Sequence, residues 1–142
     1  MRYFVHIAYD GSSYHGWQFQ TNATSIQAEI ETALQDIFKE KVSITGCGRT
    51  DRGVHASQYF FHFNIEEEIE FDLKFRLNKK LPDTIVVFDV MKMTPKQNAR
   101  LDATSRTYDY YIHLDKDPFL NSYSTLFEIE ELDIEAMKKA VN

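Results

Sequence analysis

The first segment of the chain alternates between apolar and polar residues, which is the pattern of a β-strand with one buried face. We expect this strand over residues 2–10. From about residue 24 the apolar positions recur every three or four residues, which is the spacing of a helix with one buried face. Thr24 and Gln27 have the spacing of a capping box, so the helix is expected to begin near Thr24. The apolar positions of the two elements are Tyr3, Val5, Ile7, Tyr9, Ile26, Ile30, Leu34, Ile37 and Phe38.

Four further elements complete a first structural unit. Apolar and aromatic runs predict strands at residues 42–45 and 58–65. Leucines spaced by four residues predict a helix over residues 72–81, which Pro82 ends. A continuous run of Ile, Val and Phe predicts a strand at residues 85–93, in the centre of the sheet. The order β-α-β-β-α-β is that of ferredoxin-like folds, so we expect an α+β sandwich with helices on one face of a largely antiparallel sheet.

The remainder of the chain predicts the start of a second unit. Residues 105–114 alternate strictly between the two faces of a strand, and Asp133 has the position of an N-cap for a helix that continues to Asn142. No further element follows that helix. We therefore expect a first domain at residues 1–100, which carries the reactive loop described below, and a truncated beginning of a second α/β domain at residues 101–142.

Composition narrows the class of protein. Apolar residues make up 43% of the chain and aromatic residues 14%, which excludes intrinsic disorder. Cys47 is the only cysteine, so an internal disulfide is impossible and a reducing compartment is favoured. No apolar run approaches the length that spans a bilayer. We expect a protein of the cytoplasm that does not associate with membranes.

The densest chemical signal is the loop at residues 46–55, which contains three glycines. Its single carboxylate, Asp51, is flanked by Arg49 and Arg52. Neighbouring guanidinium groups favour the charged form of a carboxyl group, so Asp51 suits a nucleophile or an electrostatic stabiliser better than a general acid. The arginines can hold a phosphate. The alternative is a structural Arg–Asp pair that fixes a turn.

Other candidate residues carry weaker signals. Cys47 is interpreted as a small core thiol, because the local sequence shows no histidine partner for a nucleophile. No metal site is expected, since no two histidines have the i, i+4 spacing of metal ligands. Tyr14 and Trp17, on a loop rich in glycine and serine, are candidates for stacking on a base. The alternative for both is an aromatic lid packed on the core. The histidines are His6, His15, His55, His62 and His113.

Five blocks of the sequence, in order, resemble the bacterial tRNA pseudouridine synthase A family over nearly the whole chain. The most specific is the loop Gly48-Arg49-Thr50-Asp51-Arg52-Gly53-Val54-His55-Ala56. The others are Tyr9-Asp10-Gly11-Ser12-Ser13-Tyr14-His15-Gly16-Trp17-Gln18, Ser25-Ile26-Gln27, Asn78 through Leu81-Pro82-Asp83, and the run from Ala99-Arg100 through Ala103-Thr104 to Arg106-Thr107-Tyr108-Asp109-Tyr110.

The resemblance implies a function and a set of site residues. The family isomerises uridine to pseudouridine in the anticodon stem-loop of tRNA, at uridines 38, 39 and 40, without a cofactor or metal, and acts as a homodimer. Asp51 falls on its catalytic aspartate and is the expected nucleophile, Tyr108 on the tyrosine that packs against the target uracil, and Arg49 on an active-site arginine. We expect further RNA contacts from Arg52, His55, Tyr14 and Trp17. Family members are about twice as long, so the resemblance also implies that this chain has only one wall of the cleft.

Two other function classes remain open. A non-catalytic ferredoxin-like module could read single-stranded RNA on sheet aromatics such as Tyr59 and Phe61. A small-molecule hydrolase could use the pair Asp51 and Arg49, although no other spacing in the sequence supports it.

The net charge of −6 is unusual for a protein that binds nucleic acid. Five acidic residues and no basic residue lie in each of the segments 66–72 and 128–135. The other segments hold all 16 Lys and Arg residues against 12 Asp and Glu residues. We interpret the two acidic segments as solvated edges that face away from RNA, because the attraction of phosphates falls off over about one Debye length.

Overall fold

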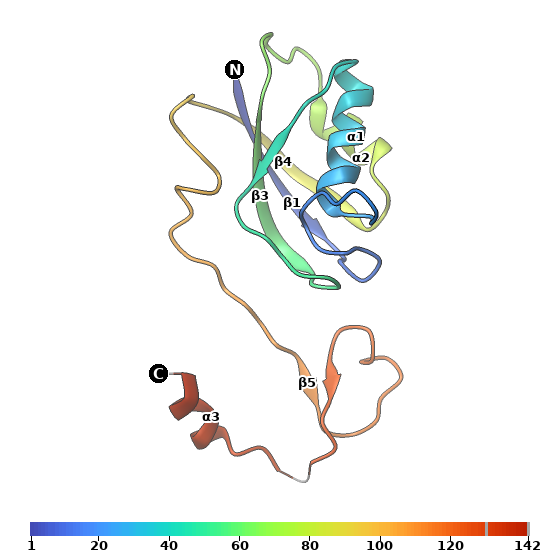
Figure 1. The fold of residues 1–142 in the computed structure, drawn as a ribbon, viewed down its shortest axis with the longest axis vertical. Helices are drawn as coiled ribbons and strands as arrows, with labels where there is room; N and C mark the ends of the chain where they lie inside the picture. Colours follow the sequence, from blue (N-terminus) through green and yellow to red (C-terminus); the bar gives the residue numbers. More distant parts are fainter. Residues whose placement is uncertain (130, 142) are drawn as a thin grey trace. The chain divides into compact units, whose positions relative to one another are not determined.

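A computed structural model describes residues 1–129 and 131–141 of the chain (Figure 1). The chain divides into two compact units, with the boundary between Ser105 and Arg106. The predicted continuation of the last helix to Asn142 lies outside the described residues.

The first unit has the predicted order of strands and helices. Its elements are β1 (Arg2–Tyr9), α1 (Ile26–Phe38), β2 (Ile44–Gly46), β3 (Ala56–Asn64), α2 (Leu73–Lys80) and β4 (Ile85–Met93). The four strands form one antiparallel sheet in the order β2-β3-β1-β4. Both helices cover the same face of this sheet (Figure 1). The α+β prediction is confirmed.

The core lies between the helices and one face of the sheet. Alternate residues of β1 are buried, as their apolar pattern predicts. They meet the apolar stripes of the two helices, which bury Ile30 and Leu34 of α1 and Leu77 of α2 completely. Phe61 and Phe63 of β3 complete this layer and are also fully or almost fully buried. Each such side chain stabilises the fold by about 1.5–3 kcal/mol through removal of apolar surface from water.

Two details of the predicted elements are wrong. Strand β4 lies at an edge of the sheet and not at its centre. Its continuous apolar run arises because Phe88 stands on the sheet face without helices, where its side chain is 43% exposed. Helix α1 is capped by Ser25, whose hydroxyl oxygen accepts from the amide of Ala28 at 3.2 Å. Thr24 donates its hydroxyl to the Ser13 carbonyl instead.

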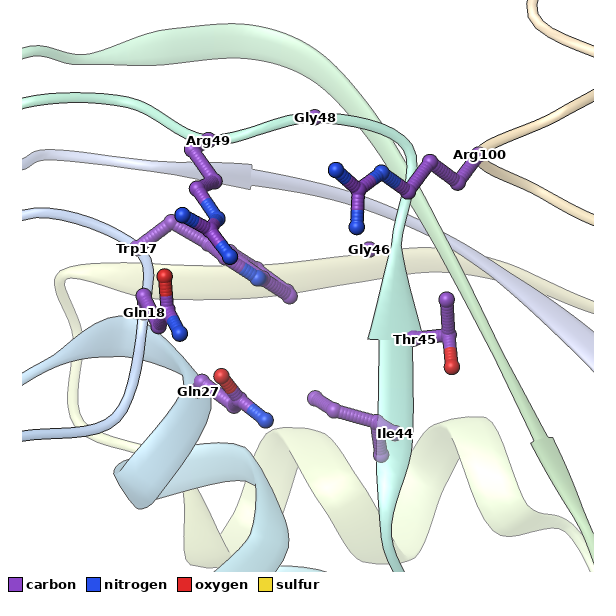
Figure 2. A pocket seen from close by; sticks show the side chains of 9 residues that line it. All are labelled: Trp17, Gln18, Gln27, Ile44, Thr45, Gly46, Gly48, Arg49 and Arg100. Atoms are coloured by element: carbon purple, nitrogen blue, oxygen red, sulfur yellow. The ribbon is translucent and has the colours of Figure 1, made fainter.

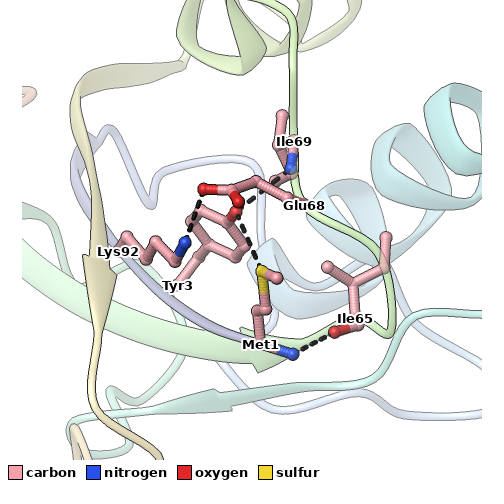
Figure 3. Close-up of polar contacts among 6 residues, drawn as sticks. All are labelled: Met1, Tyr3, Ile65, Glu68, Ile69 and Lys92. Atoms are coloured by element: carbon pink, nitrogen blue, oxygen red, sulfur yellow. Dashed lines mark hydrogen bonds and ion pairs between the residues drawn. The ribbon is translucent and has the colours of Figure 1, made fainter.

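The acidic segment at residues 66–72 is attached to the end of the sheet where β1 begins and β4 ends (Figure 3). The N-terminal ammonium of Met1 donates to the Ile65 carbonyl, and the Tyr3 hydroxyl accepts from the Ile69 amide at 3.1 Å. Lys92 of β4 pairs with Glu68. The Glu68 side chain is still 54% exposed, as expected for a solvated acidic edge.

The second unit has little regular structure. Strands β5 (Ile112–His113) and β6 (Thr125–Leu126) pair in parallel, and α3 (Ile134–Val141) begins after Asp133, whose carboxylate accepts from the Ala136 amide. The predicted strand at residues 105–114 therefore forms only at its end. Alternation alone does not make a strand, because its backbone also needs a partner for hydrogen bonds. The Tyr111 carbonyl accepts from the Thr125 amide of β6, whereas residues 105–110 belong to no paired strand among the described residues.

The segment after β4 is fixed to the open face of the sheet by a buried histidine. His62 of β3 is 4% exposed, and its Nδ1 accepts from the Ala99 amide at 3.1 Å. Arg2 donates to the Gln97 carbonyl of the same segment. Burial, followed by the nearby charge of Arg2, lowers the pKa of His62, whereas the charge of Asp102 raises it. The folded state therefore favours the neutral imidazole.

Acidification is expected to destabilise the first unit through His62. Because the folded-state pKa lies below the usual 6.5, the unfolded chain binds more protons below that pH, and unfolding becomes easier as the pH falls toward the folded-state pKa. One such group costs at most about 1.4 kcal/mol per pH unit. Denaturant unfolding from pH 7.5 to 5 checks this, with His62→Gln as the comparison. Equal pH dependence in the two proteins would contradict the assignment.

Candidate active site

The predicted reactive loop connects β2 to β3 and carries its charged residues at the surface. Arg49, Asp51 and Arg52 are all exposed. Asp51 lies at the start of a turn in which its carbonyl accepts from the Val54 amide at 3.2 Å. Within residues 1–129 and 131–141, the Asp51 carboxylate forms no ion pair with either arginine. The alternative of a structural Arg–Asp pair therefore has no support in this conformation.

The backbone of this loop is held by the loop that follows β1. The Trp17 amide donates to the Thr50 carbonyl at 3.0 Å, and the Gly53 amide donates to the Tyr14 carbonyl at 3.2 Å. These two bonds flank Asp51 on both sides. They fix the position of an exposed carboxylate without contacting its side chain.

Helix α1 in turn holds the first loop. The first amides of a helix have no partner within the helix. Here the Ile26 amide donates to the Gly16 carbonyl at 3.3 Å and the Gln27 amide to the Trp17 carbonyl at 3.0 Å. The chain of hydrogen bonds therefore runs from the N-terminus of the helix through residues 16 and 17 to Thr50, which precedes Asp51.

Side chains add to this attachment. The hydroxyl groups of Tyr9 and Thr50 are 2.8 Å apart and share a hydrogen bond. The Tyr59 hydroxyl donates to the Gly48 carbonyl at 2.5 Å. Tyr9 and Tyr59 belong to the two central strands of the sheet, β1 and β3, so these side chains attach the loop directly to the centre of the sheet.

His55 joins the end of the reactive loop to the first loop. Its Nδ1 lies 3.1 Å from the Asp10 carboxylate and 3.2 Å from the Gly11 amide nitrogen. A neutral Nδ1 accepts from Gly11, whereas a protonated one pairs with Asp10. Hydrogen bonds from Ser12 lower the pKa of the Asp10 carboxyl, and the charge of His55 acts in the same direction.

Tyr14 and Trp17 are not presented to solvent as base-stacking residues would be. Their side chains are 6% and 3% exposed. The Trp17 ring lies 4.2 Å from the ring of Tyr59, and the Tyr14 hydroxyl shares a hydrogen bond with Thr84 at 2.8 Å. This placement corresponds to the alternative of an aromatic lid packed on the core.

The remaining predicted residues differ in their surroundings. Tyr108 lies in the second unit, where its side chain is 61% exposed. Cys47 is a half-buried free thiol packed against the core. The described residues contain no group of three or more His, Cys, Asp or Glu side chains that could hold a metal ion. No described helix is long and apolar enough to cross a membrane.

Sequence reasoning missed the residues that position the loop. Tyr9 and Thr50 are 41 positions apart, so no local pattern connects them. The signal available was their membership in two separate blocks of the family resemblance.

Tyr9→Phe is expected to reduce activity more than stability. Loss of the hydroxyl contact costs about 1 kcal/mol of unfolding free energy. The same loss frees Thr50 next to Asp51, and small displacements of a reacting group cost large factors, so we expect kcat to fall about tenfold with little change in KM. Steady-state kinetics would measure kcat and KM in a chimaera that joins residues 1–142 to the remaining half of a full-length family member. Tyr3→Phe is the matched control, because it removes a buried hydroxyl contact at the other end of β1. Equal effects on kcat would contradict a positioning role for Tyr9.

The family of the chain follows from comparison with known proteins. A family model described as tRNA pseudouridine synthase matches residues 5–105. The chain is 43% identical to tRNA pseudouridine synthase A of Parabacteroides distasonis, covering 98% of this chain and 56% of that protein. It is 42% identical to tRNA pseudouridine synthase A of Thermosipho africanus, covering 99% and 59% respectively. The chain spans about half the length of the curated relatives it matches. The chain belongs to the tRNA pseudouridine synthase family.

Proposed function

We propose that this chain supplies the nucleophile-bearing half of a tRNA-uridine isomerase that forms pseudouridine in the anticodon stem-loop. The single observation that carries the proposal is the exposed carboxylate of Asp51 on a backbone fixed from both sides. A nucleophile must reach its substrate and must also be held in one place. Asp51 meets both requirements, and its position in the family signature supports the same role.

The reaction is an isomerisation that needs no second substrate. The bond between N1 of uracil and C1′ of ribose breaks, the uracil rotates, and C5 bonds to the same C1′ while its proton is lost and N1 gains one. An anionic Asp51 can trap the sugar or the base, or assist loss of a ribose proton. A base within a helical stem has to be flipped out before these atoms can be reached.

Two further residues receive roles in this proposal. Arg49 would fill the vacated position in the stem or hold the phosphate of the flipped nucleotide, since an exposed guanidinium suits both tasks. Tyr108 would stack on the uracil and help remove the C5 proton through its hydroxyl. Arg52 and His55 would contact the RNA beside them. We further propose that the whole protein is a homodimer that works in the cytoplasm.

The non-catalytic RNA-binding alternative loses its proposed contacts. Tyr59 and Phe61, which were expected to read bases on the sheet, are 4% and 0% exposed and face the helices. Stacking on a base needs an accessible ring face.

A chimaera tests the proposed function. Residues 1–142 would replace the matching half of the Parabacteroides distasonis relative, so that both halves are present. The purified chimaera should convert uridines of the anticodon arm in a tRNA transcript to pseudouridine, as detected by mass spectrometry after chemical derivatisation. A transcript with cytidines at those positions should remain unmodified in that arm. A folded chimaera that forms no pseudouridine, beside an active intact relative, would contradict the proposal.

A further inference from the structure

A cavity of about 190 Å³ lies beside the reactive loop, between the start of α1 and strand β2. Two arginines from distant parts of the sequence border it, Arg49 from the reactive loop and Arg100 from the segment after β4 (Figure 2). The other lining residues are Trp17, Gln18, Gln27, Ile44, Thr45, Gly46 and Gly48. The proposed mechanism leaves Arg100 and the interior of this cavity without a role.

Arg100 is held in place by the turn that contains it. The Asn98 side-chain oxygen accepts from the amides of Arg100 and Leu101 at 3.0 and 3.1 Å. Asp102 closes the turn, because its carboxylate accepts from the Asn98 amide at 2.7 Å. The bond from the Ala99 amide to His62 then fixes the turn to the sheet.

Arg49, on the other border of the cavity, is also held by hydrogen bonds of the backbone around it. The residue before it is fixed by the Tyr59 hydroxyl at the Gly48 carbonyl, and the residue after it by the Trp17 amide at the Thr50 carbonyl. Two guanidinium groups that would repel each other are therefore kept at one cavity by fixed backbone. Such an arrangement is typical of sites that bind an anion.

The surroundings of the cavity offer polar groups besides the two arginines. The Glu31 carboxylate is already used within the protein, because its Oε1 accepts from the Ile44 amide at 3.1 Å and from the Gln27 side chain at 3.0 Å. The Gln27 side-chain oxygen accepts from the Phe19 amide. Gln18 and Thr45 line the same cavity and are exposed, so their side chains can donate to an anion's oxygens.

We propose that this cavity binds a backbone phosphate of the RNA substrate, with Arg100 as a substrate-binding residue opposite Arg49. The inference rests on the proposed function for the identity of the ligand. Arginine binds phosphate through two parallel N–H groups, and its five donors allow this beside contacts to the protein. One phosphate between two arginines would also relieve their mutual repulsion.

The salt dependence of RNA binding tests this assignment. The 142-residue chain is titrated against a fluorescently labelled anticodon stem-loop hairpin, and Kd is measured between about 50 and 200 mM KCl. Arg100→Ala should weaken binding roughly tenfold and reduce the slope of log K against log salt by about 0.7–0.9, the value for one phosphate contact. Arg100→Lys should keep the slope and weaken binding less, because it keeps the charge but loses the paired donors.

Lys74→Ala provides the charge-matched control, since Lys74 borders a separate cavity near Tyr3 at the other end of β1. It should change Kd less than twofold and leave the slope unchanged. Arg100→Ala behaving like this control would overturn the proposal, as would a folded wild-type chain that does not bind the hairpin. Weaker binding by Arg100→Ala with an unchanged slope would show that the cavity takes a base, which also overturns it.

The variant Asp51→Asn separates this inference from the proposed function. In the Asp51→Asn background, Arg100→Ala should still reduce the slope by about 0.7–0.9, because the Asp51 carboxylate does not border the cavity. If the chimaera carrying Asp51→Asn still forms pseudouridine, the proposed function fails while the binding result stands. If only the slope of Arg100→Ala fails to change, the phosphate site fails while the proposed function stands.

Discussion

Asp51→Asn is expected to lower the rate of pseudouridine formation by at least about 10⁴-fold, the scale seen when a member of a catalytic nucleophile system is removed. Asparagine has nearly the same shape as aspartate but lacks the anionic oxygen that would attack the substrate or stabilise positive charge on it. The Asp51 side chain is exposed, and its loop is held through backbone bonds to Trp17 and Tyr14. The free energy of unfolding should therefore change by no more than about 0.5 kcal/mol. Single-turnover kinetics of the chimaera and denaturant unfolding of the chain measure the two quantities.

Asp36→Asn is the matched control for this change. Asp36 is an exposed carboxylate at the end of α1, where it pairs with Lys80 on the helix layer. Its replacement should leave the rate of pseudouridine formation unchanged. An Asp51→Asn chimaera within tenfold of its parent would exclude Asp51 as nucleophile. A large loss of stability in that variant would instead revive the structural interpretation of the carboxylate.

The topology of the first unit was predictable from the sequence because each element buries one face. Strand β1 and helix α1 follow periods of two and about 3.6 residues without interruption, and these periods determine which residues face the core. The position of β4 was not predictable in the same way. A continuous apolar run is the same for a central strand and for an edge strand whose second face carries residues such as Phe88. Local sequence records that a face is apolar, but not what covers it.

The reactive loop was predictable for a different reason. Glycines and paired charges are rare enough in combination to mark Asp51 and its neighbours, and the family resemblance gave them roles. The supporting contacts of Tyr9, and the meeting of Arg49 with Arg100 at one cavity, depend on the tertiary fold. Burial likewise favours the aromatic-lid interpretation of Trp17 over base stacking, two uses that its sequence context left open. Tyr108 stays a prediction from the resemblance.

Gly16→Ala is expected to destabilise the first unit by about 2–6 kcal/mol, the sum of a conformational cost and an overpacking cost and the largest stability effect among these substitutions. Gly16 has φ of +91°, a conformation that costs an L-residue about 1–3 kcal/mol. A Cβ there would also lie 2.4 Å from the Thr50 carbonyl oxygen. That oxygen is backbone and accepts from the Trp17 amide, so it cannot move without breaking the attachment of the reactive loop. The overpacking that results adds about 1–3 kcal/mol to the loss of unfolding free energy.

Gly53→Ala separates the two costs, since Gly53 has a similar φ of +78° but no atom within 4 Å of its Cβ position. This variant should lose only the conformational part, about 1–2 kcal/mol. Denaturant unfolding of both variants then gives the close-contact cost by difference, and equal losses would show that the loops move apart freely. In that case Asp51 would be less firmly held than its backbone contacts indicate. A larger loss for Gly16→Ala, together with reduced activity of the corresponding chimaera, would instead show that the approach of the first loop to Thr50 both stabilises the fold and places the carboxylate.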